Sequence, residues 1–277
     1  MANLNPVGQV RSVAAPDGVM IEYEVVGAGE PIALLHGGFV GRYAFSRQRA
    51  LAERFRLILP SSRGHDRTDG RLPPHFGFGT TEVEDLCAVL QAEAGDRVHL
   101  IGHSSGGAVA FAFARRFPER VDHLVLIEPT LLSLLPSPER ELVTKQWSTA
   151  IEAGESEGDL AALRATMEYI GGEAWRRLDA EAKSSRLQAL ASMAHITIPH
   201  LRGLLDFEVT EADVRTLGPP TLLIYGSASF DFEPAIQKRL CDLRPDLQSL
   251  VIEGAGHNSH RERPEIVNAM IDRFLVT

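Results

Sequence analysis

Two kinds of hydrophobic pattern alternate along the chain. Short apolar runs rich in β-branched residues predict buried strands, and apolar positions three or four residues apart predict helices. The expected strands are 21–26, 32–35, 56–59, 98–101, 121–127, 221–225 and 249–252, and the expected helices are 82–94, 106–116, 233–243 and 264–274. Strands that alternate with helices predict an α/β fold, with a mostly parallel central sheet flanked by helices on both faces.

One long stretch breaks this alternation. Between Leu131 and Leu217 no segment has a convincing strand pattern, and Ala, Glu, Leu and Arg dominate the composition. We interpret the stretch as a helical insert between two strands of the sheet. The chain is therefore expected to consist of a core, formed by residues 1–130 and 218–277, and a helical cap formed by residues 131–217.

Composition narrows the classes of function. The chain has 277 residues, of which 44% are hydrophobic and 23% charged, as in globular proteins with a full core. The 28 basic and 37 acidic residues give a net charge of −9, which disfavours nucleic acid as a partner. The longest apolar run, residues 108–114, is far shorter than the ~20 residues that a membrane helix needs, so no membrane segment is expected.

The two cysteines, Cys87 and Cys241, lie in segments with helical periodicity and form no disulfide framework. The first ten residues contain no apolar stretch of signal-peptide length. We therefore expect reduced thiols and a cytoplasmic location.

The sequence Gly-His-Ser-Ser-Gly at residues 102–106 lies between an expected strand and an expected helix, which is the context of a nucleophile elbow. The glycines two positions on either side of Ser104 leave room for a tight turn that exposes the hydroxyl. The helix that begins behind the serine favours developing negative charge. We predict Ser104 as the nucleophile, and we expect the neighbouring Ser105 to give its backbone N–H to an oxyanion.

His257 ends the sequence Glu-Gly-Ala-Gly-His and lies in the loop after the last expected strand. An α/β sheet places active-site groups at the carboxyl ends of its strands. A serine hydroxyl needs a general base, and we predict His257 for that role ahead of His260, which lies closer to the terminal helix. The two histidines have no third ligand at a suitable spacing, so no metal is expected.

The turn His-Gly-Gly-Phe at residues 36–39 directly follows the second expected strand. A turn at this point can aim a backbone N–H at a substrate carbonyl, and an oxyanion hole needs two such donors. We predict that the N–H of Gly38 or of Phe39 acts together with that of Ser105. A dinucleotide site is excluded, because His36 stands where the fingerprint G-x-G-x-x-G needs its first glycine.

The order of an oxyanion turn, G-x-S-x-G, a helical insert and a late histidine resembles the α/β-hydrolase superfamily, in its serine-nucleophile branch with a helical cap. The resemblance covers nearly the whole chain. Residues 61–68 are similar to the family loop D-x-R-G-x-G-x-S but depart from it at Ser61 and Asp66. These two departures change no member of the expected triad. The resemblance implies a triad of serine, histidine and an acid, a pocket roofed by the cap, and no cofactor.

Two residues are candidates for the acid of this triad. Most members of the superfamily have an aspartate three residues after the glycine that follows the strand 221–225, and this chain has Ser229 there. Asp231, two residues further on, is one substitute, although it could simply cap a helix. Glu128, directly after the strand 121–127, is the other, although relatives that use the ordinary aspartate also carry Glu-Pro here. We prefer Glu128, because the usual position is vacant and its side chain is longer.

These residues predict a serine hydrolase that cleaves a small to medium carboxylic ester through an acyl-enzyme. Ester cleavage rests on family analogy, so a cofactor-free C–C hydrolase, lactonase or perhydrolase of the same fold stays open. A relative that binds a ligand without turnover also stays open, since Ser229 replaces the usual acid. The expected partner is a small-molecule substrate, and a homodimer is possible.

Overall fold

The computed structural model describes residues 8–73, 75–170 and 175–276. Its strands are β1 (Gln9–Ala14), β2 (Met20–Val26), β3 (Pro31–Leu35), β4 (Arg56–Pro60), β5 (Val98–His103), β6 (Val121–Ile127), β7 (Thr221–Gly226) and β8 (Gln248–Ile252). Its helices are α1 (Thr81–Glu93), α2 (Ser105–Arg116), α3 (Ser137–Glu157), α4 (Asp159–Ile170), α6 (Ala180–Leu190), α7 (Thr197–Leu205), α8 (Glu211–Arg215), α9 (Glu233–Leu243), α10 (Ser259–Glu262) and α11 (Pro264–Leu275).

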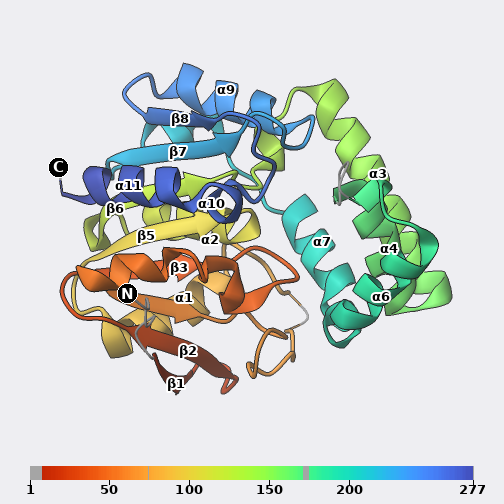
Figure 1. Cartoon of the computed structure of the whole chain (residues 1–277), viewed down its shortest axis with the longest axis horizontal. Coiled ribbons are helices and arrows are strands. Elements are labelled where there is room, and N and C mark those ends of the chain that lie inside the picture. Colours follow the sequence, from red (N-terminus) through yellow and green to blue (C-terminus); the bar gives the residue numbers. More distant parts are fainter. Residues whose placement is uncertain (1–7, 74, 171–174, 277) are drawn as a thin grey trace.

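The strands form one sheet in the order β1-β2-β4-β3-β5-β6-β7-β8 (Figure 1). The pairs β1–β2 and β2–β4 are antiparallel, and the pairs from β4 through β3 to β8 are parallel. Helices cover both faces. Leu86 of α1, Phe111 of α2 and Ile236 of α9 belong to one buried cluster, and Ile271 and Phe274 of α11 belong to another. The predicted α/β-hydrolase architecture, with a mostly parallel sheet flanked by helices, is confirmed.

The seven strands expected from the sequence are all present, with ends shifted by a residue or two. The strand that the pattern missed is β1, which pairs only with β2 at the edge of the sheet. Its residues are nearly all exposed, so the sequence Gln-Val-Arg-Ser-Val-Ala carries no buried apolar run. An exposed edge strand lacks the hydrophobic signal on which the prediction depends.

Between β6 and β7 the described residues form helices and no strand. Figure 1 shows α3, α4, α6 and α7 grouped to one side of the sheet. One of them reaches back to the core, since a Cβ placed on Gly38, just after β3, would lie 3.1 Å from His200 Nε2 on α7. The insert therefore covers the carboxyl end of β3. The division into a core and a cap at residues 131 and 217 stays a prediction.

None of the described helices combines the length and hydrophobicity that crossing a bilayer requires. The cytoplasmic location and the possible homodimer remain predictions.

Arg63, in the loop after β4, is a buried cation held by two carboxylates. Its side chain is 2% exposed and donates to both oxygens of Asp85 at 2.8 Å, while Asp17 accepts at 2.6 and 3.1 Å. We expect Arg63→Ala to lower the free energy of unfolding by ~3–5 kcal/mol, because it leaves the buried Asp85 carboxylate uncompensated.

Urea denaturation at pH 7 measures this loss. The matched control is Arg71→Ala, which removes an ion pair to Asp69 from a side chain that is 71% exposed and should cost less than ~1 kcal/mol. Equal losses in the two variants would contradict the interpretation of Arg63 as a buried structural cation.

Candidate active site

Ser104 occupies the sharp turn between β5 and α2. Its backbone has φ 55° and ψ −122°, a conformation that residues other than glycine rarely adopt. The flanking glycines are required by close packing: a Cβ on Gly102 would lie 2.4 Å from the carbonyl oxygen of Gly106, and a Cβ on Gly106 would lie 2.2 Å from that of Leu35. The chain thus forms the strained elbow that the sequence predicts, with α2 beginning at Ser105.

The hydroxyl of Ser104 lies 3.4 Å from Thr130 Oγ1. Among the hydrogen bonds of the described residues, none joins Ser104 to His257. The structure therefore places the predicted nucleophile at the elbow and leaves its bond to the predicted base unformed.

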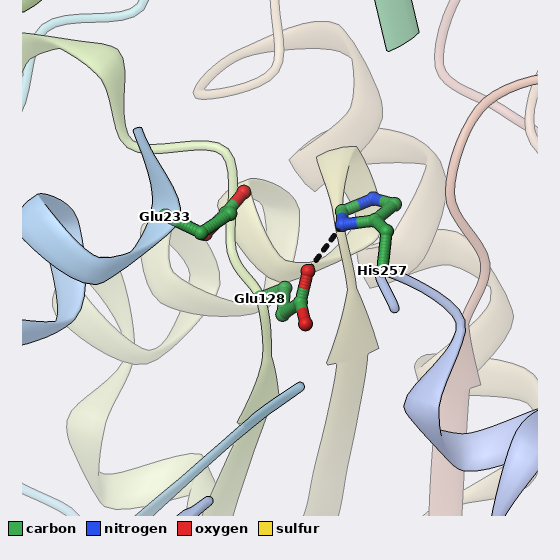
Figure 2. A group of neighbouring side chains, drawn as sticks. All are labelled: Glu128, Glu233 and His257. Atoms are coloured by element: carbon green, nitrogen blue, oxygen red, sulfur yellow. Dashed lines mark hydrogen bonds and ion pairs between the residues drawn. The ribbon is translucent and has the colours of Figure 1, made fainter. Parts of the chain in front are cut away.

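His257 lies in the loop after β8 and is fixed by Glu128, which directly follows β6. The imidazole Nδ1 is 2.5 Å from Glu128 Oε2 (Figure 2). The ring also stacks on that of Phe230, with centroids 4.3 Å apart. His103 Nε2 hydrogen-bonds the backbone carbonyl of His257 at 2.9 Å, so it acts as the donor. With Nδ1 directed at a carboxylate, Nε2 is the ring nitrogen left to accept a proton.

Glu128 is held by further hydrogen bonds. It is 1% exposed and has φ 46°. Its Oε1 accepts the backbone N–H of Gly226 at 2.7 Å, and its Oε2 accepts the hydroxyl of Ser229. The residue at the vacated aspartate position therefore supports the glutamate. Asp231 is exposed, and no hydrogen bond in the described chain joins it to His257.

His260, the rival base, is fully buried. Its ring lies 4.4 Å from that of His103, and burial lowers the pKa of His260 to about 3. A buried neutral imidazole behind His103 cannot serve as a base for substrate at the elbow.

The turn after β3 lies beside Ser104 and is braced by two neutral histidines. His36 donates from Nδ1 to the carbonyl of Gly37 at 2.7 Å and accepts the N–H of Ser62 at Nε2. Burial lowers the pKa of His36 and, more strongly, that of His65.

The structure distinguishes between Gly38 and Phe39, the two alternatives for the oxyanion donor in the turn after β3. Phe39 has φ 67°, and its N–H donates to His65 Nε2 at 3.2 Å, so it is not free to bind an oxyanion. Among the described residues, the N–H groups of Gly38 and Ser105 donate to no backbone carbonyl in a turn, loop or cap. Of the two alternatives, the structure therefore favours Gly38 together with Ser105.

Gly37 is too close to Ser104, the predicted nucleophile, to carry a side chain. A Cβ on Gly37 would lie 2.9 Å from Ser104 Cβ and 3.1 Å from His103 Nδ1. We expect Gly37→Ala to lower kcat by about 100-fold, because displacing a reacting group by ~1 Å costs about that much. The rate at which the variant cleaves a p-nitrophenyl ester, the expected class of substrate, measures the loss. The control is Gly95→Ala, which precedes β5. Its Cβ would meet nothing within 4 Å, so although φ of +69° strains an alanine there, no side chain is displaced, and an equal loss of kcat would contradict the steric argument.

The cap side of the site carries aromatic and neutral groups. His200 of α7 lies over Gly38, with ring centroids 5.9 Å from Phe39 and 4.9 Å from Phe78. Burial lowers the pKa of His200 to about 4, so the ring is neutral at pH 7. Sequence analysis missed His200, since one histidine in a helical insert carries no local signal.

Residues 32–270 match the profile of the alpha/beta hydrolase family. The chain belongs to this family. The relatives that it resembles are named for different activities. The 2-hydroxy-6-oxo-2,4-heptadienoate hydrolase of Pseudomonas putida is 29% identical over 99% of both chains. An esterase of Thermogutta terrifontis, solved with malate bound, is 26% identical, with a TM-score of 0.77 over 96% of this chain and 98% of that one.

A third relative is the putative 2-succinyl-6-hydroxy-2,4-cyclohexadiene-1-carboxylate synthase of Bacillus subtilis, 27% identical over 96% of this chain and 98% of the relative. Membership of the alpha/beta hydrolase family thus establishes a hydrolase fold but does not identify the bond that this protein cleaves.

Proposed function

We propose that this alpha/beta hydrolase cleaves small to medium carboxylic esters, with Ser104 as nucleophile, His257 as general base and Glu128 as the triad acid. The observation that carries the proposal is the 2.5 Å contact between His257 Nδ1 and the buried Glu128 carboxylate, beside a strained G-x-S-x-G elbow. A histidine oriented by a buried carboxylate is the base that an unactivated serine needs.

In this proposal Glu128 accepts a hydrogen bond from Nδ1–H, which leaves Nε2 of His257 to take the Ser104 proton. For the Ser104 hydroxyl to reach Nε2 of His257, the side chain of Ser104 rotates about χ1 and turns away from Thr130. The alkoxide attacks the ester carbonyl carbon, and the N–H groups of Gly38 and Ser105 hold the oxyanion. His257 then protonates the leaving alcohol, and a water that it deprotonates releases the acid from Ser104.

The choice of an ester rests on the groups around Gly38. Phe39, Phe78 and the neutral His200 surround the turn and offer an uncharged environment, which suits an ester better than an anionic substrate. The 26% identity to an esterase over nearly the whole chain also supports it.

C–C bond hydrolysis is the second candidate, because the dienoate hydrolase of P. putida matches 99% of this chain. The experiment compares kcat/KM for p-nitrophenyl acetate and butyrate, a γ-lactone and 2-hydroxy-6-oxo-2,4-heptadienoate. We expect the esters to exceed the dienoate by ~100-fold or more, since that anion would have to be desolvated without a cationic partner. If only the dienoate is cleaved, the protein is a C–C hydrolase and the ester proposal is wrong. If none of the four compounds is cleaved, the result favours a protein that binds a ligand without turnover.

A further inference from the structure

Glu233 is a second buried carboxyl group at the active site. It is the first residue of α9, is 2% exposed, and follows the exposed Asp231 by two positions. Ligand-type atoms of Glu233, Glu128 and His257 all lie within 4.8 Å of one another, and Figure 2 shows the three side chains together. Glu233 Oε1 is buried and has no hydrogen-bond partner among the described residues.

Such an arrangement is costly when both carboxyl groups are ionised. In the part of the chain that the structure describes, no ion pair involves Glu233, so no lysine or arginine compensates its charge. The groups that face it are Glu128 at the end of β6, His257 after β8 and Tyr169 of α4. Burial raises the pKa of Tyr169 to about 12, so this phenol is neutral at pH 7.

Two buried carboxylates so close together repel each other, and one of them keeps a proton. Glu128 already accepts hydrogen bonds from Gly226 and Ser229 and faces His257 Nδ1. Among the described residues, no group donates a hydrogen bond to Glu233 Oε1. Burial and the adjacent Glu128 carboxylate hold the pKa of Glu233 well above its usual value.

We propose that Glu233 is a positioning residue for the triad: it stays protonated while the enzyme works, so the pair Glu128–Glu233 carries a single negative charge. This inference rests on the proposed function. When His257 takes the Ser104 proton, one imidazolium then faces one carboxylate, and the buried cluster is neutral. An ionised Glu233 would add a second negative charge, hold the proton on His257 and leave less of the base free at pH 7.

The charge state of Glu233 can be read without any substrate. A carboxyl group whose folded-state pKa lies above its unfolded value stabilises the fold fully below the unfolded value, and this stability is lost as pH rises toward the folded-state value. Glutamine does not titrate. The Tm of Glu233→Gln minus that of the wild type should therefore rise by ~4 °C or more between pH 4.5 and pH 8.

The matched control is Glu265→Gln, which changes an exposed carboxyl group in the first turn of α11 and should show a difference that does not vary with pH. A flat difference for Glu233→Gln as well would overturn the proposal. Because the measurement needs no activity, a rising difference in a protein that cleaves no ester would refute the proposed function and leave the charge assignment standing.

The positioning role is tested by kinetics. Glu233→Gln, a neutral isostere of the protonated acid, should keep kcat within ~2-fold and leave the acid limb of the kcat/KM profile within ~0.3 pH units of the wild type. Glu233→Ala should lower kcat by ~10-fold with KM little changed, because Glu128 and His257 lose a packed neighbour. Rescue by glutamine supports the proposal. An acid limb displaced by a full unit in Glu233→Gln, or an unaltered kcat in Glu233→Ala, would overturn it.

Discussion

Glu128→Gln is expected to lower kcat for ester hydrolysis by about 1,000- to 10,000-fold. In the proposed mechanism the carboxylate orients His257 through Nδ1 and stabilises the imidazolium that forms when Ser104 loses its proton. A glutamine amide carries no charge, and its NH₂ group can face Nδ1 and impose the wrong tautomer. The fold should survive, because glutamine has the same shape and can still accept the N–H of Gly226.

The matched variant is Asp231→Asn, which changes the other candidate acid. Asp231 is exposed and forms no hydrogen bond to His257 among the described residues, so the kcat of Asp231→Asn should stay within ~2-fold of the wild-type value. Steady-state hydrolysis of a p-nitrophenyl ester measures both variants, with circular dichroism to check folding. A large loss in Asp231→Asn together with little change in Glu128→Gln would assign the acid to Asp231.

Ser104→Ala is expected to lower kcat by about 100,000- to 1,000,000-fold, since a nucleophile and its base act as a unit. The affinity for a non-reactive ester analogue should stay within ~3-fold of the wild-type value, because the proposed oxyanion donors are backbone N–H groups that the substitution leaves in place. Ser105→Ala is the comparison within the same elbow. It keeps the backbone N–H at residue 105, so kcat should fall less than ~10-fold. The reverse order of losses would assign the nucleophile to Ser105.

The parallel part of the fold could be predicted because its strands are buried on both faces and therefore appear as continuous apolar runs. The exposed edge strand β1 could not, because its alternation of polar and apolar residues matches no buried surface. Pro199 lies within the helical insert, although a proline inside a helix usually interrupts it. The structure places it in the first turn of α7, where a proline removes no N–H that the helix needs.

Ser104 and His257 could be singled out because each lies in a short local motif at the end of a strand. Glu128 could be inferred only from the vacancy at Ser229. The structure adds a physical reason: the shorter serine donates its hydroxyl to Glu128. Glu233 and His200 carried no local signal, because a glutamate in the first turn of a helix is common and only the packing of distant segments brings either residue to the site.

Backbone strain at the site also lay beyond sequence reasoning. In the described residues four non-glycine positions have positive φ, and Phe39, Ser104 and Glu128 are three of them. They directly follow β5 and β6 or lie in the turn after β3, neighbouring parallel strands of one sheet. Strain of this kind persists only where the surrounding structure enforces it, and it gathers at functional sites.

Labelling the purified enzyme with a fluorophosphonate, followed by mass spectrometry of the adduct, tests whether His257 makes Ser104 reactive. We expect one adduct per chain, on Ser104, and a much slower reaction in His257→Ala. Unlabelled wild-type protein, or an adduct on another residue, would contradict this expectation.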